Sequence, residues 1–137
     1  MLRISGADLD IDSLLAATSL VPEISYRKGE TRRNGTIHER SGAAFLVSAA
    51  DFDDFEAQKN GALIILTERH DAIRTLMQFP GVDGGCLDFG ILRRDTVVQC
   101  DFFPPELLKL AGELGLGIEL SQYPCNTDDE EPTTAST

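Results

Sequence analysis

Apolar and polar residues alternate with a period of two in several short segments. A period of two places successive side chains on opposite faces of a sheet, so these segments are predicted to be strands. They are residues 2–5, 23–28, 43–48, 86–92, 97–101 and 118–123. In the second of them, Ile24 and Tyr26 are expected to face the core, with Ser25 and Arg27 facing water. Residues 93–96 are predicted to join two strands in a hairpin.

A spacing of three or four residues between apolar positions predicts three helical segments. The first carries Leu14 and Leu15, with Asp10 or Asp12 as its cap and Pro22 beyond its end. The second covers residues 51–79, with apolar positions from Phe52 onward and a polar stretch at 68–71 that can divide it. The third opens at Pro104 and Pro105 and ends at the glycines of 115–117.

The two ends of the chain show the same order of elements. A shift of 94 positions places Ile4 on Val98, Leu14 on Leu108 and Ile24 on Ile118. The predicted fold is therefore α+β: a mainly antiparallel sheet of about five to six strands, helices packed on one face, and two strand–helix–strand units. Residues 1–125 are predicted to form a single domain, and residues 126–137 a disordered acidic tail.

If the helices cover one face of the sheet, polar side chains must line the other. The alternation assigns nine residues to that open face: Arg3, Ser5, Ser25, Arg27, Asp88, Gln99, Asp101, Glu119 and Ser121. Such a face can be merely solvated, or it can be a docking platform for a protein or ligand. Under the second interpretation the candidate binding residues are Arg3, Arg27, Lys28, Arg32, Asp88, Asp101 and Glu119.

The charge restricts the class of partner. The formal net charge is −11, which disfavours nucleic acid and anionic membranes because both are polyanionic. It favours association with a basic partner. Against this background, residues 25–40 hold five basic and two acidic side chains, so a basic hairpin is predicted on an acidic body. An ordinary solvated loop is the simpler interpretation of this segment, and a contact element is the alternative.

The location expected from the sequence is the cytoplasm, with no membrane association. The longest apolar run, residues 62–66, is far too short for a spanning helix, and the opening residues lack a signal peptide's apolar region. The three cysteines, Cys86, Cys100 and Cys125, form no CxxC pair. Reduced thiols therefore fit better than a disulfide framework.

The sequence assigns no catalytic residue, metal ligand or cofactor. His38 and His70 are interpreted as surface histidines, and the glycines of 81–85 follow a predicted helix where a phosphate loop would precede one. Cys100 is expected to be buried and inert beside Val98. A pair of carboxylates on neighbouring strands, Asp88 and Asp101, is the one candidate for acid and base chemistry.

A set of short motifs resembles a bacterial family defined as domain of unknown function 4279. They are Leu2-Arg3-Ile4-Ser5-Gly6, Leu9, Leu14, Pro22, Tyr26-Arg27-Lys28-Gly29-Glu30, Pro105-Glu106-Leu107-Leu108, the segment 114–118 and Tyr123. The match spans residues 2–123. The resemblance implies a compact α+β domain of bacterial origin, similar to small proteins that accompany secreted toxins as immunity proteins. It implies no functional residues.

Two functional hypotheses follow from the sequence. The first is a non-catalytic acidic binding protein that neutralises a basic toxin by direct binding. The alternative is a small enzyme or ligand-binding domain that uses the polar sheet face, with Asp88, Asp101 and Arg27 as its polar groups. The oligomeric state is not predicted.

Overall fold

One sheet of five strands organises the chain, in the order β2-β3-β1-β4-β5. The strands are β1 (Leu2–Gly6), β2 (Ile24–Tyr26), β3 (Ser41–Phe45), β4 (Gly84–Leu92) and β5 (Gly117–Tyr123). The computed structural model describes residues 1–124. All neighbouring strands are antiparallel except β4 and β5, which run parallel. The predicted α+β fold with a mainly antiparallel sheet is confirmed.

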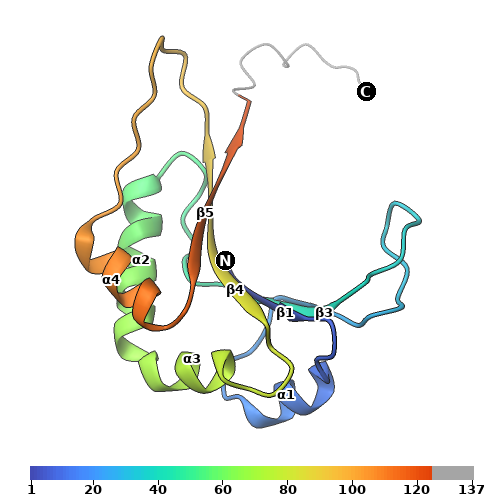
Figure 1. Cartoon of the computed structure of the whole chain (residues 1–137). Helices are drawn as coiled ribbons and strands as arrows, with labels where there is room; N and C mark the ends of the chain where they lie inside the picture. The colour runs from blue at the N-terminus through green and yellow to red at the C-terminus, as the bar shows by residue number, and fades with distance from the viewer. Residues whose placement is uncertain (125–137) are drawn as a thin grey trace.

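Within residues 1–124, four helices pack on one face of this sheet: α1 (Ile11–Ala17), α2 (Phe55–Glu68), α3 (His70–Met77) and α4 (Pro105–Glu113). Figure 1 shows that the sheet is strongly curved and that the helices lie along its outer, convex side. The concave side is open. Within the described residues, no helix combines the length and apolarity needed to cross a membrane.

The core forms where the inward side chains of the strands meet the apolar stripes of the helices. The strands contribute Leu2, Ile4, Ala43, Phe45, Leu87, Phe89 and Ile91, and the helices contribute Leu14, Ala62, Leu66, Ile73, Leu76, Leu107 and Ala111. Each of these residues is almost completely buried. In β1 and β4 the buried positions alternate with more exposed ones, as the period of two predicts.

Helix ends follow local chemistry. The side chain of Asp10 accepts a hydrogen bond from the backbone N–H of Ser13 at 3.1 Å, which caps α1. Because this bond stabilises the charged carboxylate, the pKa of Asp10 lies below its usual value. Asp54 caps α2 in the same way through the N–H of Ala57. The long helical stripe divides at Arg69, inside the stretch where a break is expected.

The structure corrects the predicted hairpin after β4. Residues 93–104 form no strand; they make a long loop that connects β4 to α4. Val97 is fully exposed, and Cys100, expected in the core, is exposed as well. The second strand–helix–strand unit therefore consists of β4, α4 and β5, a parallel crossover, because β5 returns beside β4.

The facing of β2 is also the reverse of the prediction. Ile24 pairs with Ala44, which pairs with Arg3, so Ile24 and Tyr26 lie on the concave side. Ile24 is 56% exposed. Ser25 pairs with Ala43 and so points to the helical side. Ile24 and Tyr26 share one face, as the alternation predicts, but that face is the concave side and not the core. An edge strand of three residues carries too few side chains to indicate which of its faces is buried. The predicted acidic tail lies outside the described residues.

Candidate functional site

The centre of the concave face carries six polar side chains on three adjacent strands: Arg3, Ser5, Cys86, Asp88, Glu119 and Ser121. Strand register brings them together. Arg3 on β1 lies opposite Cys86 on β4, and Asp88 lies opposite Glu119 on β5. Residues two apart in a strand share a face, so Ser5 and Ser121 complete the set.

Asp88 is the centre of the concave face. Its Oδ2 accepts hydrogen bonds from Nε and Nη2 of Arg3 at 3.3 and 3.2 Å, and its Oδ1 accepts one from Ser121 Oγ at 2.7 Å. The carboxylate side chain is only 12% exposed, whereas Arg3 is 52% exposed. Because both oxygens accept hydrogen bonds, the side chain of Asp88 is held in place and ties β1, β4 and β5 together.

Glu119 and Cys86 form a second, weaker pair beside Asp88. The thiol of Cys86 donates to Glu119 Oε1 at 3.8 Å. Burial raises the pKa of the Cys86 thiol, and the nearby carboxylates of Glu119 and Asp88 raise it further, because a thiolate is disfavoured near negative charge. Glu119 is exposed to solvent, so its carboxylate is accessible to a cationic group from outside.

We expect Cys86 to react with iodoacetamide several-fold more slowly than the exposed Cys100 at mildly alkaline pH. The attacking species is the thiolate. The raised pKa lowers the fraction of Cys86 that is ionised, and partial burial limits the access of the reagent to its sulfur. Peptide-resolved mass spectrometry after a short labelling pulse measures both rates. Labelling in denaturant is the control and should remove the difference. Equal or faster labelling of native Cys86 would contradict the described environment.

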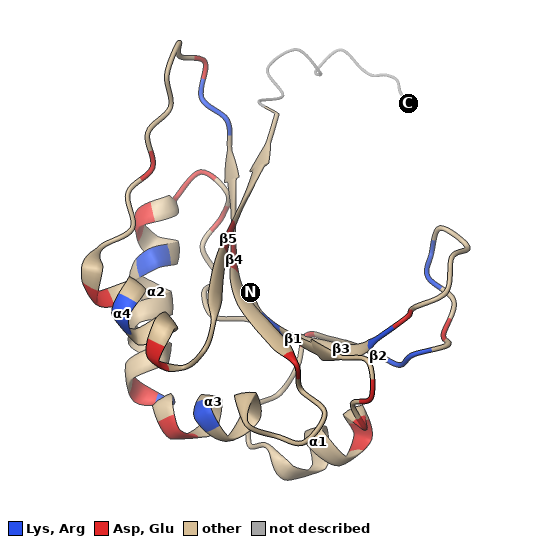
Figure 2. Ribbon diagram, viewed as in Figure 1, with Lys and Arg blue, Asp and Glu red and all other residues tan. Residues whose placement is uncertain are grey.

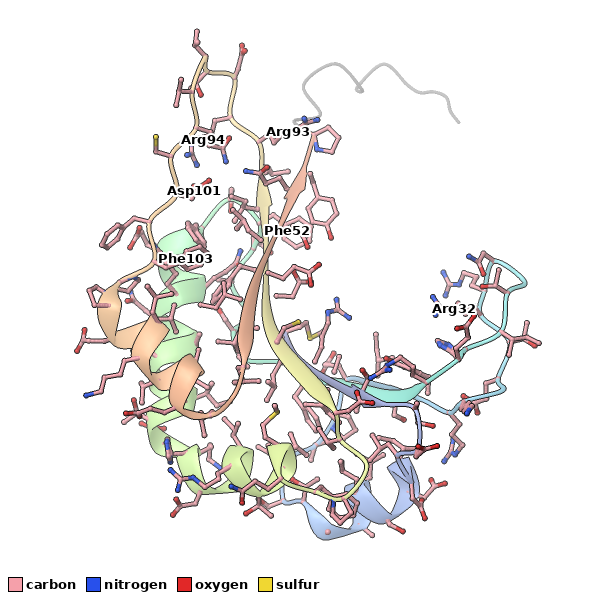
Figure 3. The ribbon with its side chains drawn as sticks, viewed as in Figure 1. Arg32, Phe52, Arg93, Arg94, Asp101 and Phe103 are labelled. Carbon is pink, nitrogen blue, oxygen red and sulfur yellow. The ribbon has the colours of Figure 1, made fainter. Side chains whose placement is uncertain are left out.

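Two aromatic rings close one end of the concave face. Phe52 and Tyr123 stack with their centroids 4.9 Å apart and their planes 5° from parallel. They lie over Gly90, where an added Cβ would stand 3.1 Å from the Phe52 ring. A cavity of about 280 Å³ borders these rings, Arg3 and Asp88. Figure 3 places Phe52 beside β4, in the loop that leads into α2.

The loop that carries Phe52 lies beside the C-terminal half of β4, where β1 no longer pairs with that strand. The N–H of Leu92 donates to the carbonyl of Phe52 at 3.2 Å, and Gln58 Nε2 donates to the carbonyl of Gly90 at 2.7 Å. The sequence interpretation placed Phe52 in a helix and missed this role. The N-cap Asp54 was the available signal, because a cap there begins the helix at Phe55.

The basic hairpin predicted in residues 25–40 stands at the opposite end of the concave face. Figure 2 shows its Lys and Arg positions away from the acidic positions on β4 and β5. Backbone bonds order it: Gly29 N–H donates to His38 O at 2.8 Å, and Gly35, in the left-handed region at φ 91°, closes the predicted turn. Tyr26 and His38 stack at 4.3 Å. The hairpin is therefore an ordered element.

The predicted basic binding residues differ in whether their side chains already bond to other groups of the chain. Arg27 pairs with Asp12 and Glu30, and its hydrogen bonds lower the pKa of Asp12 by stabilising the carboxylate. Lys28 Nζ donates to the carbonyl of Ala7 at 3.5 Å. Arg32 lies near the tip of the hairpin, apart from the sheet (Figure 3), and is exposed. Of these three, Arg32 is the most accessible to a partner.

Asp101 does not join the site. It lies in the loop after β4, where its nearly buried carboxylate pairs with Arg94 at 3.1 Å and accepts from Gln99 Nε2 at 3.0 Å. The carbonyl of Phe102 next to it accepts from Lys59 Nζ at 2.6 Å. The predicted pairing of Asp88 with Asp101 on neighbouring strands is wrong, since residues 97–101 are not a strand. Of the seven predicted binding residues, the structure brings together Arg3, Asp88 and Glu119.

Comparisons with known proteins do not assign this chain to a family. No protein-family model, curated protein or solved structure matches the chain. Within residues 1–124, no group of three or more His, Cys, Asp or Glu side chains is placed to hold a metal ion.

Proposed function

We propose that the chain is a non-catalytic binding protein that receives a protein partner on the concave face. The observation that carries the proposal is the fixed network of Arg3, Asp88 and Ser121, with Glu119 exposed beside it on an open, curved sheet. Side chains that are already held by hydrogen bonds lose little conformational freedom when a partner docks. The concave face is thus suited to binding before any partner arrives.

The hydrogen bonds that Asp88 accepts favour a binding role for this residue over acid and base catalysis. A general acid or base needs an oxygen within reach of the substrate proton. Both carboxylate oxygens of Asp88 instead accept bonds from Arg3 and Ser121. The charge of this carboxylate therefore shapes the surface and orients its neighbours.

The charge pattern indicates the partner's chemistry. Glu119 offers a negative group at the β5 side, and the basic hairpin offers Arg32 on the opposite side. A complementary partner places Lys or Arg over Glu119 and an acidic group near the hairpin. The net charge of −11 attracts a basic protein at long range. We therefore propose neutralisation of a basic toxin by direct binding as the biological role, which is also what the family resemblance implies.

The variant Glu119→Lys is expected to reduce recovery of a stoichiometric partner at least about tenfold, because reversing a complementary charge costs more than about 1.4 kcal/mol. The measurement is a pull-down at low salt with tagged protein from the native host. Glu113→Lys is the matched control, because it makes the same charge change on α4, on the convex side. It should retain the partner.

Two results would overturn this proposal. One is the absence of any stoichiometric partner at low salt, and the other is equal recovery by Glu119→Lys and Glu113→Lys. A second readout locates the contact: a bound partner should slow the alkylation of Cys86, which lies beside Glu119, and leave that of Cys100 unchanged. Faster or unchanged alkylation of Cys86 in the complex would place the partner elsewhere.

A further inference from the structure

Strand β5 is a seven-residue edge of the sheet with a row of unpaired backbone groups. The carbonyl of Tyr123 accepts from Arg93 N–H at 2.7 Å, so the polar backbone groups of Tyr123 face β4. Facing alternates along a strand, so the N–H and C=O groups of Ile118, Leu120 and Gln122 face away from β4. No protein group among residues 1–124 bonds them, and Figure 1 shows no described segment across this edge.

The other edge of the sheet is better protected against strand pairing. Strand β2 has three residues, Pro22 lies just before it, and the charged residues Arg27 and Lys28 follow it. Short length, proline and basic side chains are the usual protections of an exposed edge. Strand β5 has seven residues, Glu119 is its single charged residue, and Pro124 lies only beyond its end. One edge of this sheet is protected and the other is open to pairing.

The geometry points to a second copy of this chain as the occupant of the β5 edge, paired antiparallel about a twofold axis at Leu120. In that register the outward groups of Leu120 bond those of Leu120 in the second copy. Ile118 bonds Gln122 of the second copy, and Gln122 bonds its Ile118. Every outward N–H and C=O of these three residues is then satisfied. A twofold axis uses the same surface in both copies, so one strand supplies the whole interface.

The side chains of β5 are compatible with this self-pairing. On the concave side, Glu119 lies opposite Ser121 of the second copy, so no like charges are directly opposed. On the helical side, Leu120 lies against Leu120 and Ile118 against Gln122. The two sheets become continuous, and their concave faces open on the same side. This inference stands apart from the proposed partner binding, because it uses the edge of β5 and leaves the concave face exposed.

Light scattering coupled to size exclusion, from micromolar to millimolar protein, tests the inference. The wild type is expected to approach twice the chain mass of 14.9 kDa at the high end of this range and to dissociate on dilution. Gln122→Pro removes one outward N–H and is expected to give the monomer mass, because a proline cannot donate to the partner strand. Gln122→Ala is the matched control: it removes the side chain, keeps the N–H, and should stay dimeric. Circular dichroism confirms that each variant is folded.

Hydrogen exchange provides a measurement that needs no variant. The amides of Ile118, Leu120 and Gln122 should be protected at high protein concentration and exchange quickly on dilution, while the amide of Ser121, bonded to β4, stays protected throughout. A wild type that is monomeric over the whole range would overturn the inference. So would a folded Gln122→Pro variant that remains dimeric, or outward amides that exchange at one rate at all concentrations.

Discussion

Gly6→Ala is expected to lower the free energy of unfolding by about 3 kcal/mol, the upper part of the range for overpacked positions. A Cβ at this position would collide with the carbonyl oxygen of Gly81 and stand 2.9 Å from its carbonyl carbon. Gly81 cannot retreat easily. It lies at φ 93°, and a Cβ built on it would stand 2.8 Å from the α-carbon of Leu9 and 2.9 Å from the carbonyl oxygen of Asp8, so the backbone of these two residues confines it. The contact is between two backbone segments, so no side-chain rotation relieves it.

Gly84→Ala is the matched control for Gly6→Ala. Gly84 begins β4, opposite Ser5, and a Cβ there meets no atom within 4 Å. The same substitution should therefore be neutral or stabilise by less than about 1 kcal/mol, through the smaller entropy of the unfolded chain. Urea unfolding followed by circular dichroism measures both variants. Similar free energies for the two would show that the Gly6 and Gly81 segments are not in contact.

Leu87→Ala is expected to cost about 3 kcal/mol of unfolding free energy, within the usual range for buried leucines. Leu87 is completely buried at the centre of the sheet, between Leu2 on β1 and Ile118 on β5. Removing its side chain leaves a cavity bounded by strands on both sides and helices below. These elements cannot all move inward, because β4 is fixed by ladders to two neighbours, so most of the cavity persists.

Leu108→Ala tests whether burial, and not leucine itself, sets this cost. Leu108 on α4 is 50% exposed, and alanine is a good helix former, so the change should stay within about 0.5 kcal/mol. Both variants should be compared at one protein concentration by urea unfolding. A cost for Leu108→Ala equal to that for Leu87→Ala would contradict the described core.

Elements with strong local signals were predictable from the sequence. The cap of α1, expected at Asp10 or Asp12 and found at Asp10, and the turn at Asn34-Gly35 are examples, because capping and turn formation depend on atoms a few residues apart. The division of the long helix near Arg69 follows from its polar stretch in the same way. The inward facing of Leu2, Ile4, Leu87 and Phe89 follows from alternation, since one face of each strand is apolar.

Three other expectations failed because the deciding contacts are distant in sequence. Residues 97–101 have the composition of a strand, but β5 occupies the edge beside β4, so they have no strand to pair with. Phe52 matches a helical stripe, yet it stacks on Tyr123 across the sheet. Ile24 looks like a core residue, although its partner Ala44 places it on the concave side.

The sequence by itself determined the fold class, the polar character of one sheet face, and five of the residues on it, Arg3, Ser5, Asp88, Glu119 and Ser121. Periodicity and capping are local, so one chain segment is enough to reveal them. Only the tertiary structure decided that Asp88 is held by Arg3 and Ser121, that Asp101 lies elsewhere, and that β5 is an open edge. These facts depend on strand order and register, which are set by packing between segments that are far apart in the chain.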